Sequence, residues 1–497
     1  MKTIQMKKSI LLLLSIAILS VGCSDFLDVN DNPNDPSIST PSLTLPVAQD
    51  NFAALNARTM TYLGNMLVVN WATPSNWSAN QIYSRYNFTN SDFTNVFETS
   101  YVSIFKDLSY VENYTDPTGA VDYSGYRAMS QIIKGFQYQL LVDLYGDIPY
   151  TEANLRGDNT TPKYDDAETV YKSVIDSLTM AANLALNLPA NSEDPGTQDI
   201  ILGGHMDEWA QFANSIKLRM LVRLSNTGQD AYITSQIASI DANGAGYITQ
   251  DISSNPGYIN ADDKQSPFYD YFVNAVTLTE TDRGDYTVAA KYAIDYLTNN
   301  NDPRLERLYK PSSTGGNYKG AVQTSLLPGT GFTSTDLAKV GPGLLKSSEQ
   351  DQVIMSLAES LFVQAEAVQR GYLVGDAEAL YEAAIEESFI FLEVPDAVTE
   401  AQTYYAQPVN NIAWGSSTNK IEAIMTQKWI ALNGTSSIES WIDLTRTGYP
   451  SGLPIPSEAN GKRPVRLLYP ASELARNRDN VPTQTADAVF TSDPFWR

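Results

Sequence analysis

Apolar side chains recur at steps of three and four residues along much of the chain, and this spacing limits the fold more than any other feature. In residues 126–146 the recurring side chains are Met129, Ile133, Phe136, Leu140 and Leu144. This spacing places them on one face of an amphipathic α-helix. A glycine at 146 and a proline at 149 then predict the end of that helix. The same spacing predicts helices at 166–188, 207–224, 353–370, 377–391 and 418–433.

The predicted helices follow one another in pairs, which is typical of helix–turn–helix units stacked side by side. The sequence has no regular 34-residue period, so any tetratricopeptide-like repeats are degenerate. We therefore predict an all-α fold whose scaffold of helix pairs comprises mainly residues 47–225 and 351–445. Residues 226–350 and 446–497 contain little periodicity and are expected to be loop-rich, because long loops on a compact scaffold usually carry function.

The N-terminus has the pattern of an export signal. Lysines at positions 2, 7 and 8 precede an apolar run over 10–21, which is too short for the roughly 20 residues that a membrane-spanning helix needs. Residues 19–23 read LSVGC and resemble the bacterial lipobox, in which the cysteine thiol is acylated and the cysteine becomes the new N-terminus. Ser20 stands where that motif usually has leucine. We expect residues 1–22 to be a signal peptide and Cys23 to be lipidated; the alternative is an ordinary secretory signal followed by a chance cysteine.

Cys23 is the only cysteine of the chain, which excludes an intrachain disulfide and a cysteine-rich metal site. Residues 23–46 are rich in Asp, Asn, Ser and Pro and cannot bury much apolar surface, so they are interpreted as a flexible tether. An acidic run in this segment lacks the glycine and the distal glutamate of a calcium-binding EF-hand loop. Residues 47–497 are then expected to form the helical domain.

The formal net charge of −24 excludes nucleic acid as a plausible partner, because such a partner requires a basic surface. The same charge disfavours adsorption to anionic lipid, so contact with a membrane is expected through the lipid anchor alone. We interpret the acidity itself as a source of solubility.

Few residues are available for catalysis. His205 is the single histidine, no Gly-x-Ser-x-Gly motif is present, and neither a zinc site nor a cofactor site is predicted. Carboxylate pairs such as Asp143 with Asp147, or Glu359 with Glu366, leave a helical glycoside hydrolase as the alternative. We favour a structural role for these acids and expect that the protein is not an enzyme.

Several segments closely resemble the SusD/RagB family, and they occur in the family's order. They are FQYQLLVDLYGDIPYTEA at 136–153, DEWAQFANSIKLR at 207–219, DPRL at 302–305, AESLFVQAEA at 358–367, IEAIMTQKWI at 421–430 and WIDLTRTGYP at 441–450. The start of the expected mature chain, CSDFLDVN at 23–30, is similar to that of the family as well.

The resemblance implies an all-helical protein with four degenerate tetratricopeptide-like helix pairs that support a loop-rich face. It also implies a non-enzymatic lipoprotein on the outer face of the outer membrane. Such a protein covers a SusC-like TonB-dependent transporter and captures oligosaccharides or peptides for import. The matching motifs are expected to belong mostly to the scaffold, so they assign no ligand residues.

The candidate ligand residues therefore rest on side-chain chemistry alone. A surface that binds sugars needs flat apolar rings with polar side chains beside them. The first candidate segment contributes Trp71, Asn76, Trp77, Asn80, Tyr83 and Tyr86. Phe268 with Tyr269 is a second candidate, and Trp414 is a third. For each segment the alternative is that the rings belong to the core.

Overall fold

The computed structural model describes residues 39–323 and 331–497. The signal peptide, Cys23 and most of the expected tether therefore lie outside the described residues. Helix α2 (Pro41–Leu55) begins earlier than the expected end of the tether at residue 46. Leu45, Ala48 and Phe52 of α2 are buried at helical spacing, so their packing places this segment in the fold. Among the described residues, none of the helices is both long enough and apolar enough to cross a membrane.

The described chain is mainly helical. In the first half the helices after α2 are α3 (Thr61–Leu67), α4 (Gln81–Arg85), α5 (Thr94–Thr99), α6 (Lys106–Asn113), α7 (Ser124–Tyr145), α8 (Ala167–Leu186), α9 (Met206–Arg223) and α10 (Asp230–Asn243). In the second half they are α11 (Pro267–Phe272), α12 (Asp282–Tyr286), α13 (Lys291–Asn299), α14 (Leu305–Leu308), α15 (Leu357–Gln369), α16 (Ala377–Phe391), α17 (Ala397–Tyr405), α18 (Lys420–Ala431), α19 (Ser437–Thr447), α20 (Ala471–Arg476) and α21 (Ala488–Thr491). Two π-helical turns, η1 (Asn56–Met60) and η2 (Ser100–Phe105), continue α2 and α5.

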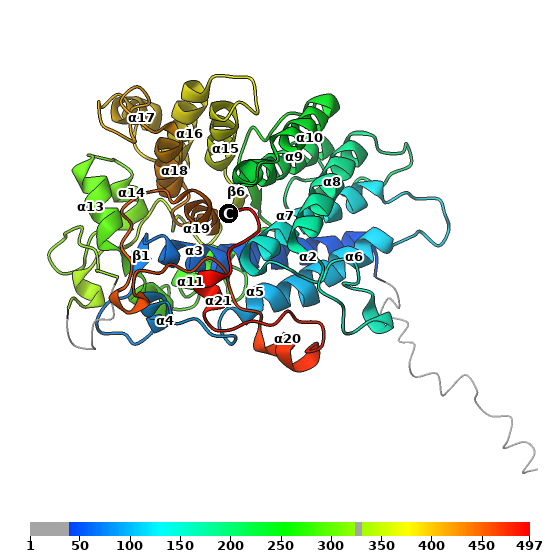
Figure 1. Cartoon of the computed structure of the whole chain (residues 1–497), viewed down its shortest axis with the longest axis horizontal. Helices are drawn as coiled ribbons and strands as arrows, with labels where there is room; N and C mark the ends of the chain where they lie inside the picture. The colour runs from blue at the N-terminus through cyan, green and yellow to red at the C-terminus, as the bar shows by residue number, and fades with distance from the viewer. Residues whose placement is uncertain (1–38, 324–330) are drawn as a thin grey trace, which may run out of the picture. The chain divides into compact units, whose positions relative to one another are not determined.

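The long helices pack as consecutive neighbours, α7 against α8, α8 against α9, and α15 against α16 (Figure 1). The prediction of an all-α fold built from tetratricopeptide-like helix pairs is confirmed. Helix α10 packs on α9 and α8 although it lies within 226–350, which we expected to be loop-rich. Its buried side chains Ile233, Ile237 and Ile240 are spaced by four and three residues, and this short stripe explains the helix.

Six short strands complete the described fold. They are β1 (Trp71–Ala72), β2 (Ile252–Ser254), β3 (Val288–Ala289), β4 (Tyr309–Lys310), β5 (Lys339–Val340) and β6 (Gln352–Met355). One antiparallel sheet has the order β1-β3-β5-β4, and β2 pairs with β6. In the first sheet Trp71 pairs with Ala289, and Val288 pairs with both Ala72 and Lys339. This sheet brings together segments that are more than 200 residues apart in the sequence.

Charged side chains from five helices meet inside the scaffold, and we call them the buried ion network. Its members are Asp143 of α7, Arg219 and Arg223 of α9, Glu359 and Glu366 of α15, Lys428 of α18, and Glu439, Asp443 and Arg446 of α19. Arg219 lies 2.8 Å from Glu359, and Arg223 contacts both Asp143 and Glu439. Because each charge has an opposite partner, the network can remain ionised in the core.

The pKa values within the buried ion network reflect the balance between burial and pairing. Burial raises the pKa of Asp143 to about 6, although Arg223 opposes the shift. Burial acts in the same direction on Glu439, but the charges of Arg219, Arg223 and Lys428 outweigh it and hold the pKa of Glu439 below its ordinary value. Glu439 is therefore held in its ionised form inside the network.

A candidate ligand-binding surface

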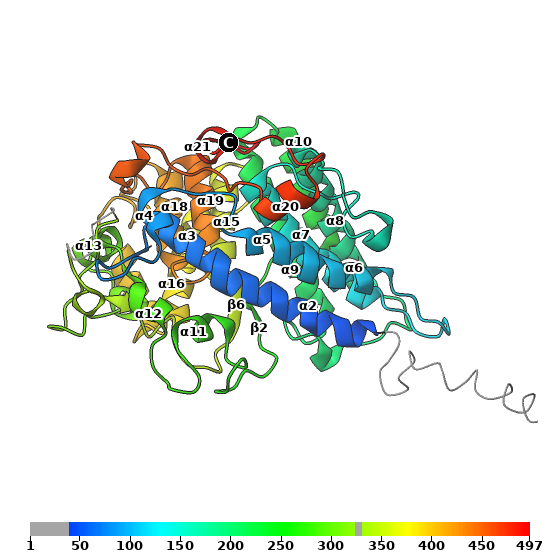
Figure 2. The same ribbon diagram turned by 90° about the horizontal axis from the view of Figure 1, so that it is seen from below.

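The sheet β1-β3-β5-β4 positions the best candidate for a ligand surface. The loop after β1 carries Trp77, α12 leads directly into β3 and carries Arg283 and Tyr286, and β5 begins at Lys339. Because Val288 of β3 pairs with both Ala72 of β1 and Lys339 of β5, the three segments are brought close together. We call Trp77, Tyr271, Arg283, Asp285 and Tyr286 the Trp77 surface. Figure 2 shows α11 and α12 among loops, away from α10 and α21.

Trp77 is half-buried and held at its polar edge. Its indole Nε1 donates a 2.7 Å hydrogen bond to Asp285, and its ring meets Tyr286 edge-to-face with 5.5 Å between the ring centroids. Lys339 Nζ donates to the other oxygen of Asp285 at 2.7 Å. Burial acts to raise the pKa of Asp285, but the hydrogen bonds from Lys339, Trp77 and Ser334 outweigh it and lower the pKa. The indole is thus fixed by an ionised carboxylate.

Arg283 forms the second part of the surface. Its guanidinium carbon lies 4.0 Å from the ring centroid of Tyr271, 5.0 Å from that of Tyr62 and 5.6 Å from that of Tyr286. Tyr271, Arg283 and Tyr286 are half-buried, whereas Tyr62 is buried beneath them. Since Tyr286 contacts both Trp77 and Arg283, the surface is a continuous row of three rings and one cation.

The amide side chains of Asn76 and Asn80 lie beside this row, and their hydrogen bonds hold the Trp77 loop in place. Asn76 is exposed; it donates to the hydroxyl of Ser334 at 3.3 Å and accepts from the backbone N–H of Ser334 at 2.9 Å. Asn80 donates to the hydroxyl of Tyr62 at 2.6 Å. Beside Asn76, Phe332 is 47% exposed and Lys319 lies over its ring. Rings, amides and charges that reach solvent together meet the chemical needs of a sugar-binding surface.

The other sequence-based candidates lie elsewhere. Trp71, Tyr83, Tyr86 and Phe268 are at most 5% exposed, so the expectation that these rings reach the surface is wrong. They form the aromatic core under the loops: Trp71 packs against Tyr62, Phe268 and Phe272. Tyr269 is half-buried on α11.

Trp414 is half-buried between α17 and α18. Its ring lies against Tyr381 at 5.2 Å and beneath Lys420 at 5.0 Å. These partners belong to α16 and α18, so Trp414 does not join the Trp77 surface.

Sequence reasoning missed Arg283, Asp285, Tyr286 and Lys339. They lie in the part that we described only as loop-rich, where no periodicity marks a buried or an exposed face. The run DRGDY at 282–286 combines charge with an aromatic ring and is the one local signal that could have indicated Arg283, Asp285 and Tyr286. Nothing in the sequence placed this run beside Trp77.

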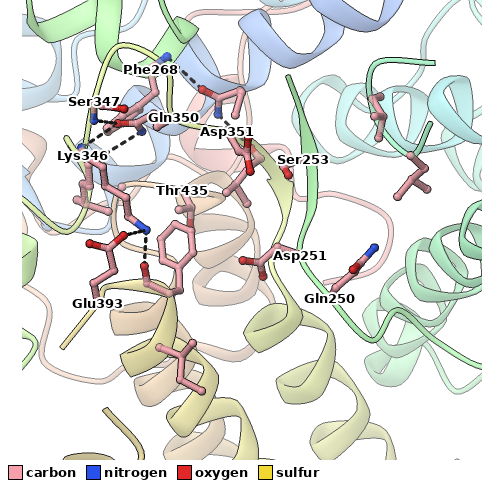
Figure 3. Close-up of a pocket in the computed structure, with 18 residues that line it drawn as sticks. Gln250, Asp251, Ser253, Phe268, Lys346, Ser347, Gln350, Asp351, Glu393 and Thr435 are labelled. Atoms are coloured by element: carbon pink, nitrogen blue, oxygen red, sulfur yellow. Dashed lines mark hydrogen bonds and ion pairs between the residues drawn. The ribbon is translucent and has the colours of Figure 1, made fainter. Parts of the chain in front are cut away.

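A separate pocket of about 720 Å³ lies between β2, β6 and the C-terminal end of α16 (Figure 3). Its lining is a mixture of polar and apolar side chains and includes Asp251, whose pKa is raised by burial. Lys346 lies 3.0 Å from Glu393 and over the ring of Phe391. The remaining aromatic lining residue, Phe268, is buried in the core. This pocket thus offers less ring surface than the Trp77 surface does.

The carboxylates that suggested catalysis have structural partners. Asp143, Glu359 and Glu366 are fully buried and paired with arginines of the buried ion network. Asp147 accepts a 2.9 Å hydrogen bond from the backbone N–H of Ala167 at the start of α8. His205 is exposed and immediately precedes α9, as expected of a loop residue.

Comparisons with known proteins agree with the fold. A model of SusD-like proteins, described as starch-binding and associating with the outer membrane, matches residues 33–470. A solved chitin-binding protein is 25% identical, with a TM-score of 0.71 and coverage of 89% of this chain and 95% of that one. A SusD homologue from Bacteroides uniformis is also 25% identical, with a TM-score of 0.71 and coverage of 90% and 95%.

A SusD/RagB family protein from Bacteroides thetaiotaomicron is 18% identical, with a TM-score of 0.73 and coverage of 92% of this chain and 99% of that one. At this identity the likeness concerns the fold alone. No curated protein matches the chain.

Proposed function

Because this chain belongs to the SusD-like family of starch-binding proteins that associate with the outer membrane, we propose that it captures oligosaccharides at the cell surface and delivers them to a SusC-like TonB-dependent transporter. The solved chitin-binding protein that it resembles supports a carbohydrate ligand over a peptide. In this proposal the protein is a binding protein and not an enzyme, since the acids that suggested a glycoside hydrolase are buried against arginines.

The observation that carries this proposal is the half-buried pair of Trp77 and Tyr286, bordered by the exposed amide of Asn76. Aromatic faces bind the apolar faces of sugar rings, and short polar side chains bind the hydroxyl groups. The hydrogen bond from Trp77 to Asp285 fixes the ring before the ligand arrives, which lowers the entropic cost of binding.

Replacing Trp77 with Ala should weaken oligosaccharide binding about tenfold or more while leaving the protein folded. A central aromatic side chain commonly contributes well over 1 kcal/mol to binding. The measurement is calorimetric titration of purified residues 24–497 with chitin and starch oligosaccharides and with mixed peptides. The same samples should be assayed for cleavage products, whose appearance would contradict a purely binding role.

Trp414→Ala is the matched control, because Trp414 is also half-buried but contacts Tyr381 and Lys420. Its affinity should equal that of the wild type. If affinity falls in Trp414→Ala and persists in Trp77→Ala, the site lies near α17 and α18 instead. Binding of peptides alone would overturn the carbohydrate proposal.

The proposed location requires a lipid anchor at Cys23 after removal of residues 1–22. We expect labelled palmitate to enter the wild-type protein in cells and to be absent from Cys23→Ala, which should be released from the membrane fraction. Several acyl chains are needed for stable attachment, so loss of the cysteine should release the protein completely. Equal labelling of both proteins would exclude Cys23 as the anchor.

A further inference from the structure

Arg283 presents a charge that the protein itself does not neutralise. Its guanidinium makes no hydrogen bond and no ion pair with any described residue, and none of its nitrogens is buried. Every other described arginine that is at least half-buried donates to a carboxylate, an amide, a hydroxyl or a backbone carbonyl. Arg58, which is on the neighbouring turn η1, shows the usual arrangement, donating to Asp270 at 2.9 Å. The free donors of Arg283 are therefore a specific feature of the Trp77 surface.

The acids around Arg283 are already engaged with other cations. Asp285 accepts from Trp77 and Lys339, and Glu280 pairs with Lys310 and Lys339. Asp270 pairs with Arg58 at 2.9 Å. Asp282 is exposed at the first position of α12 and makes no ion pair with Arg283. Thus no acid of the described chain forms an ion pair with the guanidinium.

The tyrosine rings hold the guanidinium in place. Tyr271 lies closest, at 4.0 Å, and Tyr62 and Tyr286 lie within 6 Å. Stacking on rings attracts the cation and restricts its motion while leaving the N–H groups at its edge free. A guanidinium fixed in this way is preorganised for two parallel hydrogen bonds to a carboxylate.

We propose that the Trp77 surface selects oligosaccharides that carry a carboxylate, as uronic acids do, and that Arg283 is the residue that binds this carboxylate. This inference rests on the proposed function, because it names the class of sugar that the surface takes. Trp77 and Tyr286 contact the sugar rings, and the carboxylate of a neighbouring sugar unit accepts two hydrogen bonds from Arg283. When a neutral sugar is bound, the N–H groups of Arg283 remain hydrogen-bonded to water instead.

The test compares each acid with its own neutral derivative. Oligosaccharides of galacturonic, glucuronic and mannuronic acid, together with their methyl esters, are titrated into residues 24–497. The wild type should bind at least one acid about 10–100-fold more tightly than its ester, which corresponds to a hydrogen-bonded charged pair. This comparison needs no variant, so it decides the question even if every Arg283 variant misfolds.

Variants then assign the preference to Arg283. In Arg283→Met, which keeps an unbranched chain against the tyrosines, the acid and the ester should bind equally. In Arg283→Lys, part of the preference for the acid should remain, because the charge is retained without the two-pronged geometry. Thermal unfolding of each variant confirms that it is folded. A preference for the acid that survives in folded Arg283→Met would overturn the role of Arg283.

The failure of this inference is distinct from the failure of the proposed function. If neutral oligosaccharides bind in a Trp77-dependent way and no acid exceeds its ester, the inference is wrong and the proposed function stands. Sulfated neutral oligosaccharides are titrated in the same way, and if they bind more tightly than every carboxylated one, the carboxylate assignment is wrong. If no oligosaccharide binds, both are wrong.

Discussion

Replacing Glu439 with Gln should lower the free energy of unfolding by about 3–5 kcal/mol, since removing one member of a buried ion pair leaves its partner charged and uncompensated. Glu439 is fully buried and contacts both Arg223 and Arg219. It also accepts a 3.2 Å hydrogen bond from Gln139. The glutamine keeps the shape of the side chain, so the loss reports charge and not volume.

The measurement is the midpoint of urea unfolding for each protein, with the slope of the transition compared to show that the same surface unfolds. Asp295→Asn is the matched control, because Asp295 pairs with Lys291 on the exposed face of α13 and about half of each side chain reaches solvent. An exposed pair contributes about 0–1 kcal/mol. Equal small effects of the two substitutions would show that the buried ion network does not stabilise the scaffold.

The buried ion network also explains how far the sequence could predict the fold. The segments 136–153, 207–219, 358–367, 421–430 and 441–450 carried the resemblance to SusD/RagB proteins, and all of them contribute members or neighbours of this network. Apolar spacing predicted the helices of the first four of these segments, but it did not predict α19, which contains residues 441–447. Their acids and arginines were visible too, but pairs such as Asp143 with Arg223 are 80 residues apart, and helical spacing says nothing about contacts over that range.

The candidate site was predictable only in part, for a related reason. Trp71 and Trp77 lie six residues apart in one segment of similar composition, yet Trp71 is fully buried and Trp77 is half-buried. What separates them is that β1 pairs with β3, which seats Trp71 on the aromatic core. Arg283 was not predicted because only the pairing of β1 with β3 brings α12 close to Trp77. No local sequence pattern indicates this contact. Pairing between strands that are far apart in the sequence thus explains both the wrong prediction for Trp71 and the missing prediction for Arg283.

Replacing Gly64 with Ala should destabilise the protein by about 3 kcal/mol or more, although the same change in a helix usually stabilises by up to about 1 kcal/mol. Gly64 lies in α3, where the helix meets the start of α19. A Cβ atom there would be 2.2 Å from the backbone nitrogen of Ile438 and 2.2 Å from the carbonyl carbon of Ser437. Backbone atoms cannot avoid the new Cβ by a rotamer change as a side chain could. Helices α3 and α19 must therefore move apart.

Gly125→Ala is the matched control for this change. Gly125 is also helical and buried, but an added Cβ would meet no atom closer than 3.6 Å. Its urea midpoint should be unchanged or slightly raised, whereas that of Gly64→Ala should fall. Since α3 ends at Leu67, only four residues before β1, displacement of α3 should also disturb the Trp77 loop. Gly64→Ala should therefore lose oligosaccharide affinity together with stability, while Trp77→Ala loses affinity alone. A Gly64→Ala protein as stable as the wild type would contradict the close approach of α3 and α19.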